Sequence, residues 1–412
     1  MKRLIIVLCA VSLIVSSASL LCAGGIDNKN NFSAEWMRTL NRNAATDSAD
    51  IVVYNPAGVM KMDDGLYTNL SIQYAMKDYS HNLGGTDYDT DEPDIVPGLF
   101  GVYKKGRWAG FAAFSIPCGG GSVDYKRGDA TTVGLGTRII AGSGGLFSAI
   151  KDQRLEGESY YYGYTVGGAY AVNEKLSVSL GARYIDAQRE FKGFATLSGL
   201  APDTTYEVDY EETDDGWGGI VGLNYAPTEA LNIGLRYETK TSIDLKTRLK
   251  KDTIPGGLVT DGAVRNRDLP ALFSAGASYK VTPRVRVEAG LTYYLQDSAN
   301  WDDNPVSGAD ETKKDNGYDV GVALEYAFNS QWKGSAGYMY TDVGIDTDNM
   351  SIEAPELDAH TIGFGVEYKP VSAMNVNLGV LKTFYDDAKT TSGIEFDKDV
   401  VIIALGIQYK FK

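Results

Sequence analysis

Cysteine, histidine and proline are scarce in this chain of 412 residues, and the scarcity excludes several classes of protein. Three cysteines and two histidines are too few for a disulfide framework or a zinc cluster. Beyond the N-terminus, no apolar run approaches the roughly 18–20 residues that a membrane-spanning helix needs. The 39 basic residues are outnumbered by 54 acidic ones, and a net charge of −15 argues against nucleic acid as a partner. Glycine (47) and tyrosine (27) are abundant instead, and proline numbers only 12, a bias typical of β-barrels.

The first 23 residues have the composition of an export signal. Lys2 and Arg3 precede an apolar stretch from Leu4 to Val15, and small residues follow as far as Ala23. This stretch is too short to span a membrane, so we expect a signal peptide at 1–23. Cys22 leaves lipidation open as an alternative, although the leucine before it is larger than such sites prefer.

From Leu66 onward, apolar and polar residues alternate, which places successive side chains on opposite faces of a strand. In the last run the apolar face consists of Val401, Ile403, Leu405, Ile407, Tyr409 and Phe411. Fourteen strands are predicted, near 66–76, 95–104, 107–116, 158–171, 176–191, 213–226, 231–248, 269–280, 284–296, 316–327, 332–343, 357–369, 374–386 and 397–411. An even number of strands is what single-chain bacterial barrels have.

The connections between these strands alternate in length. Short turns are predicted at 105–106, 173–174, 227–230, 281–283, 329–331 and 370–373. Long polar loops are predicted at 77–94, 117–157, 192–212, 249–268, 297–315 and 344–356. Short turns at one rim and long loops at the other are typical of outer-membrane barrels, with both termini on the periplasmic side.

A soluble β-sandwich could show the same alternation, but two features favour a membrane barrel. The apolar faces end repeatedly in aromatic residues, as girdles at a membrane boundary do: Tyr74, Tyr225, Tyr237, Tyr293, Tyr338, Tyr368 and Tyr409. The opposite faces carry charges that a sandwich core would not tolerate unpaired: Arg183, Arg236, Arg286, Glu325 and Glu367. We therefore predict an all-β fold, a 14-stranded antiparallel transmembrane β-barrel over 66–412. We expect it as a monomer in the outer membrane of a Gram-negative bacterium, with lipid and lipopolysaccharide around it.

Residues 24–65 do not alternate and are too long for a simple tail. They end in Asn55-Pro56-Ala57-Gly58, where the proline fixes a turn and the asparagine side chain is free to bond nearby backbone. Some forty small-residue-rich positions before a barrel predict a hatch, or plug, folded into the lumen.

Here the sequence resembles the FadL/TodX family of outer-membrane channels for long-chain fatty acids and other hydrophobic compounds. The stretch from Arg42 to Ala49, followed by Tyr54 to Gly58, looks like that family's hatch signature, and the resemblance covers the whole mature chain. It implies a barrel with no open axial pore. A long-chain fatty acid or other hydrophobic small molecule would be caught by an extracellular groove and held in a pocket above the hatch. It would then leave sideways beside an inward-kinked third strand.

The resemblance and the residues together give candidate sites, each with a simpler alternative. Asn55, Pro56, Ala57 and Gly58 are the expected gate, or else a rigid turn between hatch and barrel. The expected ligand-binding residues are Phe32, Trp36 and Met60 in the hatch and Ile139, Ile140, Leu146, Phe147 and Ile150 in the loop; either set could instead pack into its own core. Ser115, Ile116, Pro117 and Gly119 are the expected lateral opening, or an ordinary strand exit. Arg138, Lys151 and Arg154 are candidate partners for a carboxylate.

Other functions lack the residues they need. Asp87, Asp89, Asp91, Glu92 and Asp94 resemble a calcium loop, but glutamate stands where an EF-hand needs glycine. Neither His81 nor His360 belongs to a recognisable catalytic set, so we expect no enzyme, no metal and no cofactor. A water-filled porin and a structural or adhesive barrel remain as alternative functions.

Overall fold

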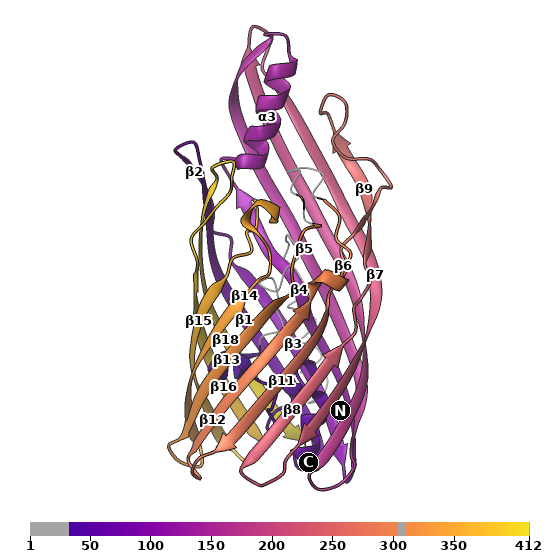
Figure 1. Cartoon of the computed structure of the whole chain (residues 1–412), viewed down its shortest axis with the longest axis vertical. Helices are drawn as coiled ribbons and strands as arrows, with labels where there is room; N and C mark the ends of the chain where they lie inside the picture. Colours follow the sequence, from indigo (N-terminus) through magenta and orange to yellow (C-terminus); the bar gives the residue numbers. More distant parts are fainter. Residues whose placement is uncertain (1–32, 304–309, 311, 412) are drawn as a thin grey trace, which may run out of the picture.

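The computed structural model describes residues 33–303, 310 and 312–411. The predicted signal peptide and the candidate ligand residue Phe32 lie outside the described residues. Eighteen strands form one antiparallel sheet that closes on itself as a barrel (Figure 1). Four strands of the barrel are each divided into two segments, namely β2 with β3, β8 with β9, β10 with β11 and β16 with β17. The barrel therefore has fourteen strands. The predicted fold is confirmed.

The elements follow one another along the chain with these bounds. The strands are β1 Gly65–Leu83, β2 Thr86–Thr90, β3 Asp94–Lys105, β4 Trp108–Tyr125, β5 Phe147–Ala171, β6 Leu176–Gly199, β7 Thr204–Tyr225, β8 Leu231–Glu238, β9 Asp244–Asp252, β10 Val264–Asn266, β11 Ala271–Lys280, β12 Val285–Leu295, β13 Gly317–Ala327, β14 Trp332–Asp342, β15 Ala359–Val371, β16 Met374–Tyr385, β17 Ala388–Lys389 and β18 Glu395–Phe411. The helices are α2 Ala34–Thr39, η2 Ala49–Val53, η3 Pro56–Lys61, α3 Ala130–Gly142, η4 Gln296–Ser298 and η5 Thr347–Asn349. Among the described residues, no helix combines the length and hydrophobicity needed to cross a membrane.

The barrel closes between its first and last strands. Residues Leu66 to Asn82 of β1 pair in unbroken antiparallel register with Phe411 to Glu395 of β18. In β18, Leu405 is 47% exposed on the outer face while its neighbour Ala404 is fully buried inside. The predicted alternation of faces is therefore correct, and it turns the apolar face outward, as lipid requires.

The predicted long loops are wrong in extent, because most of their residues continue the sheet. β6 ends at Gly199 and β7 begins at Thr204, so most of the predicted loop 192–212 is a β-hairpin. The loop predicted at 117–157 contains the end of β4, helix α3 and the start of β5. These extensions reach beyond the barrel at the end opposite the C-terminus, where α3 lies (Figure 1). Outside the lipid the outer face of a strand can be polar, so the apolar outer face that marks a membrane strand ends there.

Candidate functional site

The chain before β1 folds into a hatch inside the lumen, which we define as residues 33–64. Ser33 caps α2 by accepting a hydrogen bond from the Trp36 amide, and Leu40, with a positive φ of 51°, ends the helix. Asn55 caps η3 by accepting from the Ala57 amide, and Pro56 opens that helix where no amide donor is needed. Nearly all of the described hatch down to Met60 is buried, which requires every polar group to find a partner.

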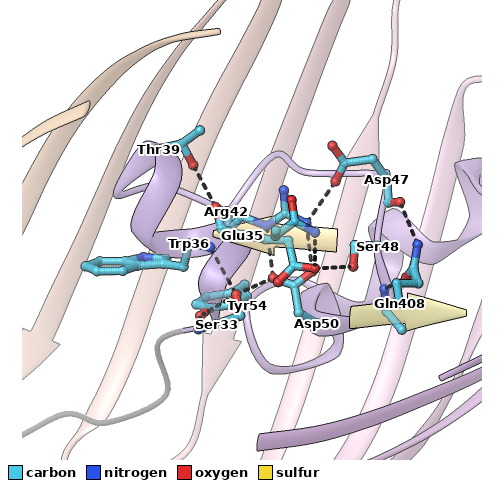
Figure 2. Close-up of polar contacts among 12 residues, drawn as sticks. Ser33, Glu35, Trp36, Thr39, Arg42, Asp47, Ser48, Asp50, Tyr54 and Gln408 are labelled. Carbon is cyan, nitrogen blue, oxygen red and sulfur yellow. Dashed lines mark hydrogen bonds and ion pairs between the residues drawn. The ribbon is translucent and has the colours of Figure 1, made fainter. Parts of the chain in front are cut away.

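Arg42 is the centre of the hatch, as Figure 2 shows. It donates to both oxygens of Asp50, at 3.1 and 2.7 Å, and lies 2.8 Å from Asp47. Ser33 donates to Asp50 at 2.6 Å, and its amide donates to the Tyr54 hydroxyl. Burial alone would raise the pKa of Asp47, but Arg42 and other cations hold it well below its usual value. These contacts join the start of the hatch to its middle.

Further polar contacts attach the hatch to the wall. Arg38 lies 3.1 Å from Glu325 of β13 and 3.6 Å from Glu367 of β15. Glu35 accepts from the amide groups of Asn69 on β1 and Asn377 on β16, at 2.6 and 2.9 Å. Burial, reinforced by the nearby charge of Asp50, raises the pKa of Glu35 to about 7. One half of the barrel therefore holds α2 from several strands at once.

The hatch backbone also fits closely against β8, β11 and β12, because glycines line these strands. Gly234, Gly276 and Gly290 lie side by side on β8, β11 and β12. A Cβ atom at Gly234 would lie 1.9 Å from the Asn43 carbonyl oxygen, and one at Gly276 would lie 2.8 Å from the Asn43 Cβ. A side chain at Gly234 or Gly276 would displace the hatch.

The predicted gate residues pack against β6 and β7, next to β8. The Asn55 side chain donates to the Leu223 carbonyl of β7 and to the Asn43 carbonyl, both at 3.1 Å. The Ala57 carbonyl accepts from Ser177 of β6 at 2.8 Å. A Cβ at Gly58 would lie 2.3 Å from the carbonyl oxygen of Ala45, so the last residue of the turn must be small.

Above the hatch lies a cavity that leaves about 960 Å³ unfilled by protein atoms, part of it open to solvent. Its lining is mainly apolar and includes Trp36, Leu40, Val53, Tyr54, Leu269, Leu272, Leu291 and Met339. Trp36, which points away from the polar centre of the hatch in Figure 2, is thus a lining residue. Met60, in contrast, packs in the apolar core of the hatch with residues of β3 and β4.

Two arginines and one glutamate form one charged group in this lining, which also contains Arg42 and Asp319. Arg183 of β6 lies 2.8 Å from Glu238 of β8, and Arg236 contacts the same carboxylate. The Nε atoms of both arginines are buried, and within the described protein neither has a hydrogen-bond partner. Two guanidinium groups on one carboxylate leave an excess positive charge beside an apolar cavity. The sequence placed both arginines on the lumen face but gave no sign that they meet.

The wall beside the cavity is interrupted. The β3–β4 ladder begins at Lys105–Trp108 and ends, within the described strands, at Leu99–Phe114. Farther along, five residues of β4 between Ser115 and Gly121 face only three of β5, because the register shifts twice. Pro117 and Cys118, in this segment, line the cavity. Of the residues predicted for a lateral opening, Ser115, Ile116, Pro117 and Gly119 all lie in the interrupted segment, and Gly119 has a φ of 121°.

Asp94, at the start of β3, bridges the outer end of the interruption. Its carboxylate accepts from the Ser122 amide at 3.1 Å, from the Ser122 hydroxyl at 3.2 Å and from Tyr160 at 3.2 Å. It also pairs with the buried Lys77 of β1. A side chain thus replaces the missing main-chain acceptors. In the sequence, Asp94 is one of five neighbouring acidic residues, and nothing distinguished it from the others.

The candidate residues of the extracellular loop are placed differently. Ile139, Ile140 and Ile150 pack with Phe147 and Leu197 in a small core beneath α3, while Leu146 is exposed. This arrangement matches the alternative in which the loop packs on itself. The cations do not reach the cavity either: Lys151 pairs with Asp203, Arg154 pairs with Asp124, and Arg138 is exposed.

The acidic residues around β2 form ion pairs with basic side chains of the protein. Arg127 pairs with Asp89, and Lys126 lies 2.9 Å from Glu92. Within the described ranges there is no group of three or more residues that could hold a metal ion.

A plugged barrel with an apolar cavity defines the class of the protein, an outer-membrane transport barrel. A family described as outer membrane protein transport protein (OMPP1/FadL/TodX) matches residues 14–412, so the chain belongs to the FadL/TodX family. Together with the barrel, this membership places the protein in the outer membrane of a Gram-negative bacterium.

Solved structures share the fold at low sequence identity. The chain is similar to a Pseudomonas aeruginosa FadL homologue, with a TM-score of 0.71 and 16% identity, covering 96% of this chain and 100% of that one. It is also similar to the P. putida toluene transporter TodX, with a TM-score of 0.66 and 14% identity, covering 89% and 96%. For the Ralstonia pickettii toluene transporter TbuX the TM-score is 0.61 and the identity 16%, covering 89% and 94%.

Among curated proteins, the chain is 34% identical over 105 residues to the 31 kDa outer-membrane immunogenic protein of Brucella melitensis. The match covers 23% of this chain and 42% of that protein. The same values hold for the protein of that name from Brucella suis. The chain therefore spans less than half the length of the curated relatives it matches.

Proposed function

We propose that the protein is a passive channel through which hydrophobic molecules cross the outer membrane. A molecule entering from the extracellular side occupies the cavity above the hatch and leaves through the interrupted wall between β3 and β4. One observation carries this proposal: Pro117 and Cys118 belong both to the interrupted part of β4 and to the lining of the cavity. One chain supplies hatch, cavity and interruption, so the channel works as a monomer surrounded by lipid and lipopolysaccharide.

The preferred substrate in this proposal is a long-chain fatty acid rather than a neutral hydrocarbon. Each methylene placed in the cavity contributes about 0.8 kcal/mol. The excess positive charge of Arg183 and Arg236 around Glu238 attracts the carboxylate, and a charge-assisted hydrogen bond contributes about 1.5–3 kcal/mol. Two of the proteins with similar structures, TodX and TbuX, are toluene transporters, which makes a monoaromatic substrate the second candidate.

Ligand entry and release require parts of the molecule to move. Asn55, Pro56, Ala57 and Gly58 act as the gate, because rearranging this turn would shift Val53 and Tyr54 in the cavity lining. The exposed Leu146 near α3 is the remaining candidate for a first contact with ligand outside the barrel. Each rearrangement requires the ligand to bind the moved state more tightly.

Restoring the wall tests the exit route. Deleting Pro117 and Gly119 leaves three residues of β4 facing three of β5, so β4 can run on without bulges and extend its ladder with β3 beyond Phe114. We expect uptake of radiolabelled oleate and toluene by cells carrying this variant to fall at least tenfold. The matched control deletes Lys250, the extra residue of a bulge between β7 and β9 outside the cavity, and should change uptake less than twofold.

The same assay separates the alternatives. Oleate uptake that survives the double deletion would disprove lateral exit. Passage of small hydrophilic sugars through the unmodified protein would instead identify a porin. If Arg183→Gln with Arg236→Gln lowers oleate and toluene uptake equally, the carboxylate preference is wrong.

A further inference from the structure

A second group of buried charges lies on the lumen face of the wall, farther along β6 than the cavity. Arg189 of β6 stands opposite Glu212 of β7 in the ladder, with 3.6 Å between their charged atoms. Arg265 of β10 binds both oxygens of Glu212, at 3.2 and 2.6 Å. Arg267, which stacks 5.3 Å from the centre of the Trp301 ring, completes the group. We call these residues the upper arginine layer.

Positive charge exceeds negative charge in this layer. Three arginines, each at most 7% exposed, face two buried carboxylates, Glu212 and Glu356. Nε and Nη1 of Arg189 and Nη1 of Arg265 are buried, and within the described protein they have no hydrogen-bond partner. Buried charges and unused donors are costly, so the layer is set up to accept an anion.

The layer repeats the pattern found beside the cavity. In both places two arginines share one glutamate, and the β6 members, Arg183 and Arg189, point to the same face because they are an even number of residues apart. Six residues of a strand separate the two layers by about 20 Å.

An apolar stretch connects the two layers. Tyr161, Ile185, Ala187, Ile243, Leu245 and Leu269 form one buried cluster, and Cys118 packs against it. Leu269 and Cys118 also line the cavity, so the cluster is continuous with the cavity lining. Above the arginines, Phe191 and Tyr210 stack at 5.3 Å in another apolar cluster.

We propose that the upper arginine layer is a second binding site, which takes the carboxylate of an anionic amphiphile while its hydrocarbon chain lies along the apolar cluster toward the cavity. The ligand would then pass its head group from Arg189 and Arg265 to Arg183 and Arg236. This inference rests on the proposed function for its physiological meaning, but the site itself is measurable without transport.

Counting bound ligand tests the site directly. Equilibrium dialysis of the full chain in non-ionic detergent, with the same detergent in both chambers, should find two radiolabelled decanoate molecules per chain. The double variant Arg189→Gln, Arg265→Gln should bind one decanoate per chain, because affinity at the upper arginine layer should fall at least tenfold. The double variant Arg183→Gln, Arg236→Gln should instead lose the decanoate bound in the cavity. Decanol, which lacks the charge, should bind all forms within twofold.

A variant that should increase decanoate affinity distinguishes a binding site from a purely structural cluster. Glu212→Gln removes the competing carboxylate, so decanoate should bind the upper layer several-fold more tightly; a purely structural cluster would lose affinity for both ligands. Retention of the folded band in unheated SDS gels checks each variant. A single decanoate per chain, or equal losses for decanoate and decanol in the Arg189/Arg265 variant, would overturn the second site. Failure of uptake with two-site binding intact would overturn the transport proposal alone.

Discussion

The two sides of the barrel wall differ in what they contact. From β11 to β16, and in β8 beside them, the strands have 8–13 residues, and glycines and ion pairs hold the hatch against them. From β4 to β7 the strands have 18–25 residues, β4 is bulged, and arginines face the lumen. Continuous ladders with close hatch contacts make the first side an anchor. On the second side, the cavity borders the interrupted wall.

The anchoring side should not tolerate a side chain at its glycines, and this is the largest effect we expect. Gly234→Val places a Cβ 1.9 Å from the Asn43 carbonyl oxygen and should expel the hatch from the lumen. Planar-bilayer recordings should then show ion conduction that the unmodified protein lacks. Gly110→Val, where an added Cβ meets nothing within 4 Å, is the control and should stay closed. A closed Gly234→Val channel would contradict the anchoring role.

Breaking the centre of the hatch should loosen it without removing it. Arg42→Met leaves the buried Asp50 unpaired, and we expect the free energy of hatch opening to fall by about 3–5 kcal/mol. Hydrogen exchange of the amides in α2 and η2 measures this quantity. Lys126→Met breaks an exposed pair with Glu92 and should leave the same amides unchanged. Equal exchange in the two variants would refute the central role of Arg42.

On the bulged side, Gly121 should be sensitive for two reasons. Its φ is 78°, and a Cβ would lie within van der Waals overlap of the Asp94 carboxylate. Gly121→Ala should therefore destabilise the outer end of the interruption by about 2–3 kcal/mol and speed exchange of the Ser122 amide. Gly85→Ala has a similar φ of 88° with open space around it, so it should show only the backbone cost of about 1 kcal/mol. Matching losses would mean that Asp94 does not bridge the strands.

The smallest effect concerns pH and is confined to α3. Burial, followed by the nearby charge of Glu353, raises the pKa of Asp129 from 3.8 to about 7. Since the folded state keeps the proton that an undocked helix would release, docking of α3 should be tightest near pH 4 and weaken as pH rises through 7. Tryptic cleavage at Arg138 measures the undocked fraction. Asp129→Asn should abolish the pH dependence, and cleavage that is independent of pH in the unmodified protein would rule the linkage out.

Much of the barrel could be predicted because lipid and lumen impose different chemistry on alternate residues. Leu405 and Tyr409 face outward as expected, and Arg183 and Glu325 face inward. Prediction failed where the outer face of a strand lies in water, as in the outer part of β6 and β7. There, the hairpin buries Phe191, Leu197 and Val208 on its inner face and carries mostly polar residues on its outer face, so the apolar outer face of a membrane strand is missing.

The sites divide in the same way. Pro117 with its following glycines signalled a disturbed strand, and Asn55-Pro56 signalled a turn, because proline and glycine act on their own backbone. Asp94, Arg189 and Arg265 carried no such local signal. Their partners lie 28, 23 and 53 residues away in the sequence.

The sequence alone determined that this chain forms a barrel with an apolar outer face, preceded by a hatch rich in small residues. Both are set by alternation and turn chemistry, which act between residues close in sequence. Only the tertiary structure decided which lumen charges share a carboxylate, where the ladder of the wall is interrupted and which strands hold the hatch. Those outcomes depend on register between strands and on atoms that closure of the barrel brings within a few ångströms of one another.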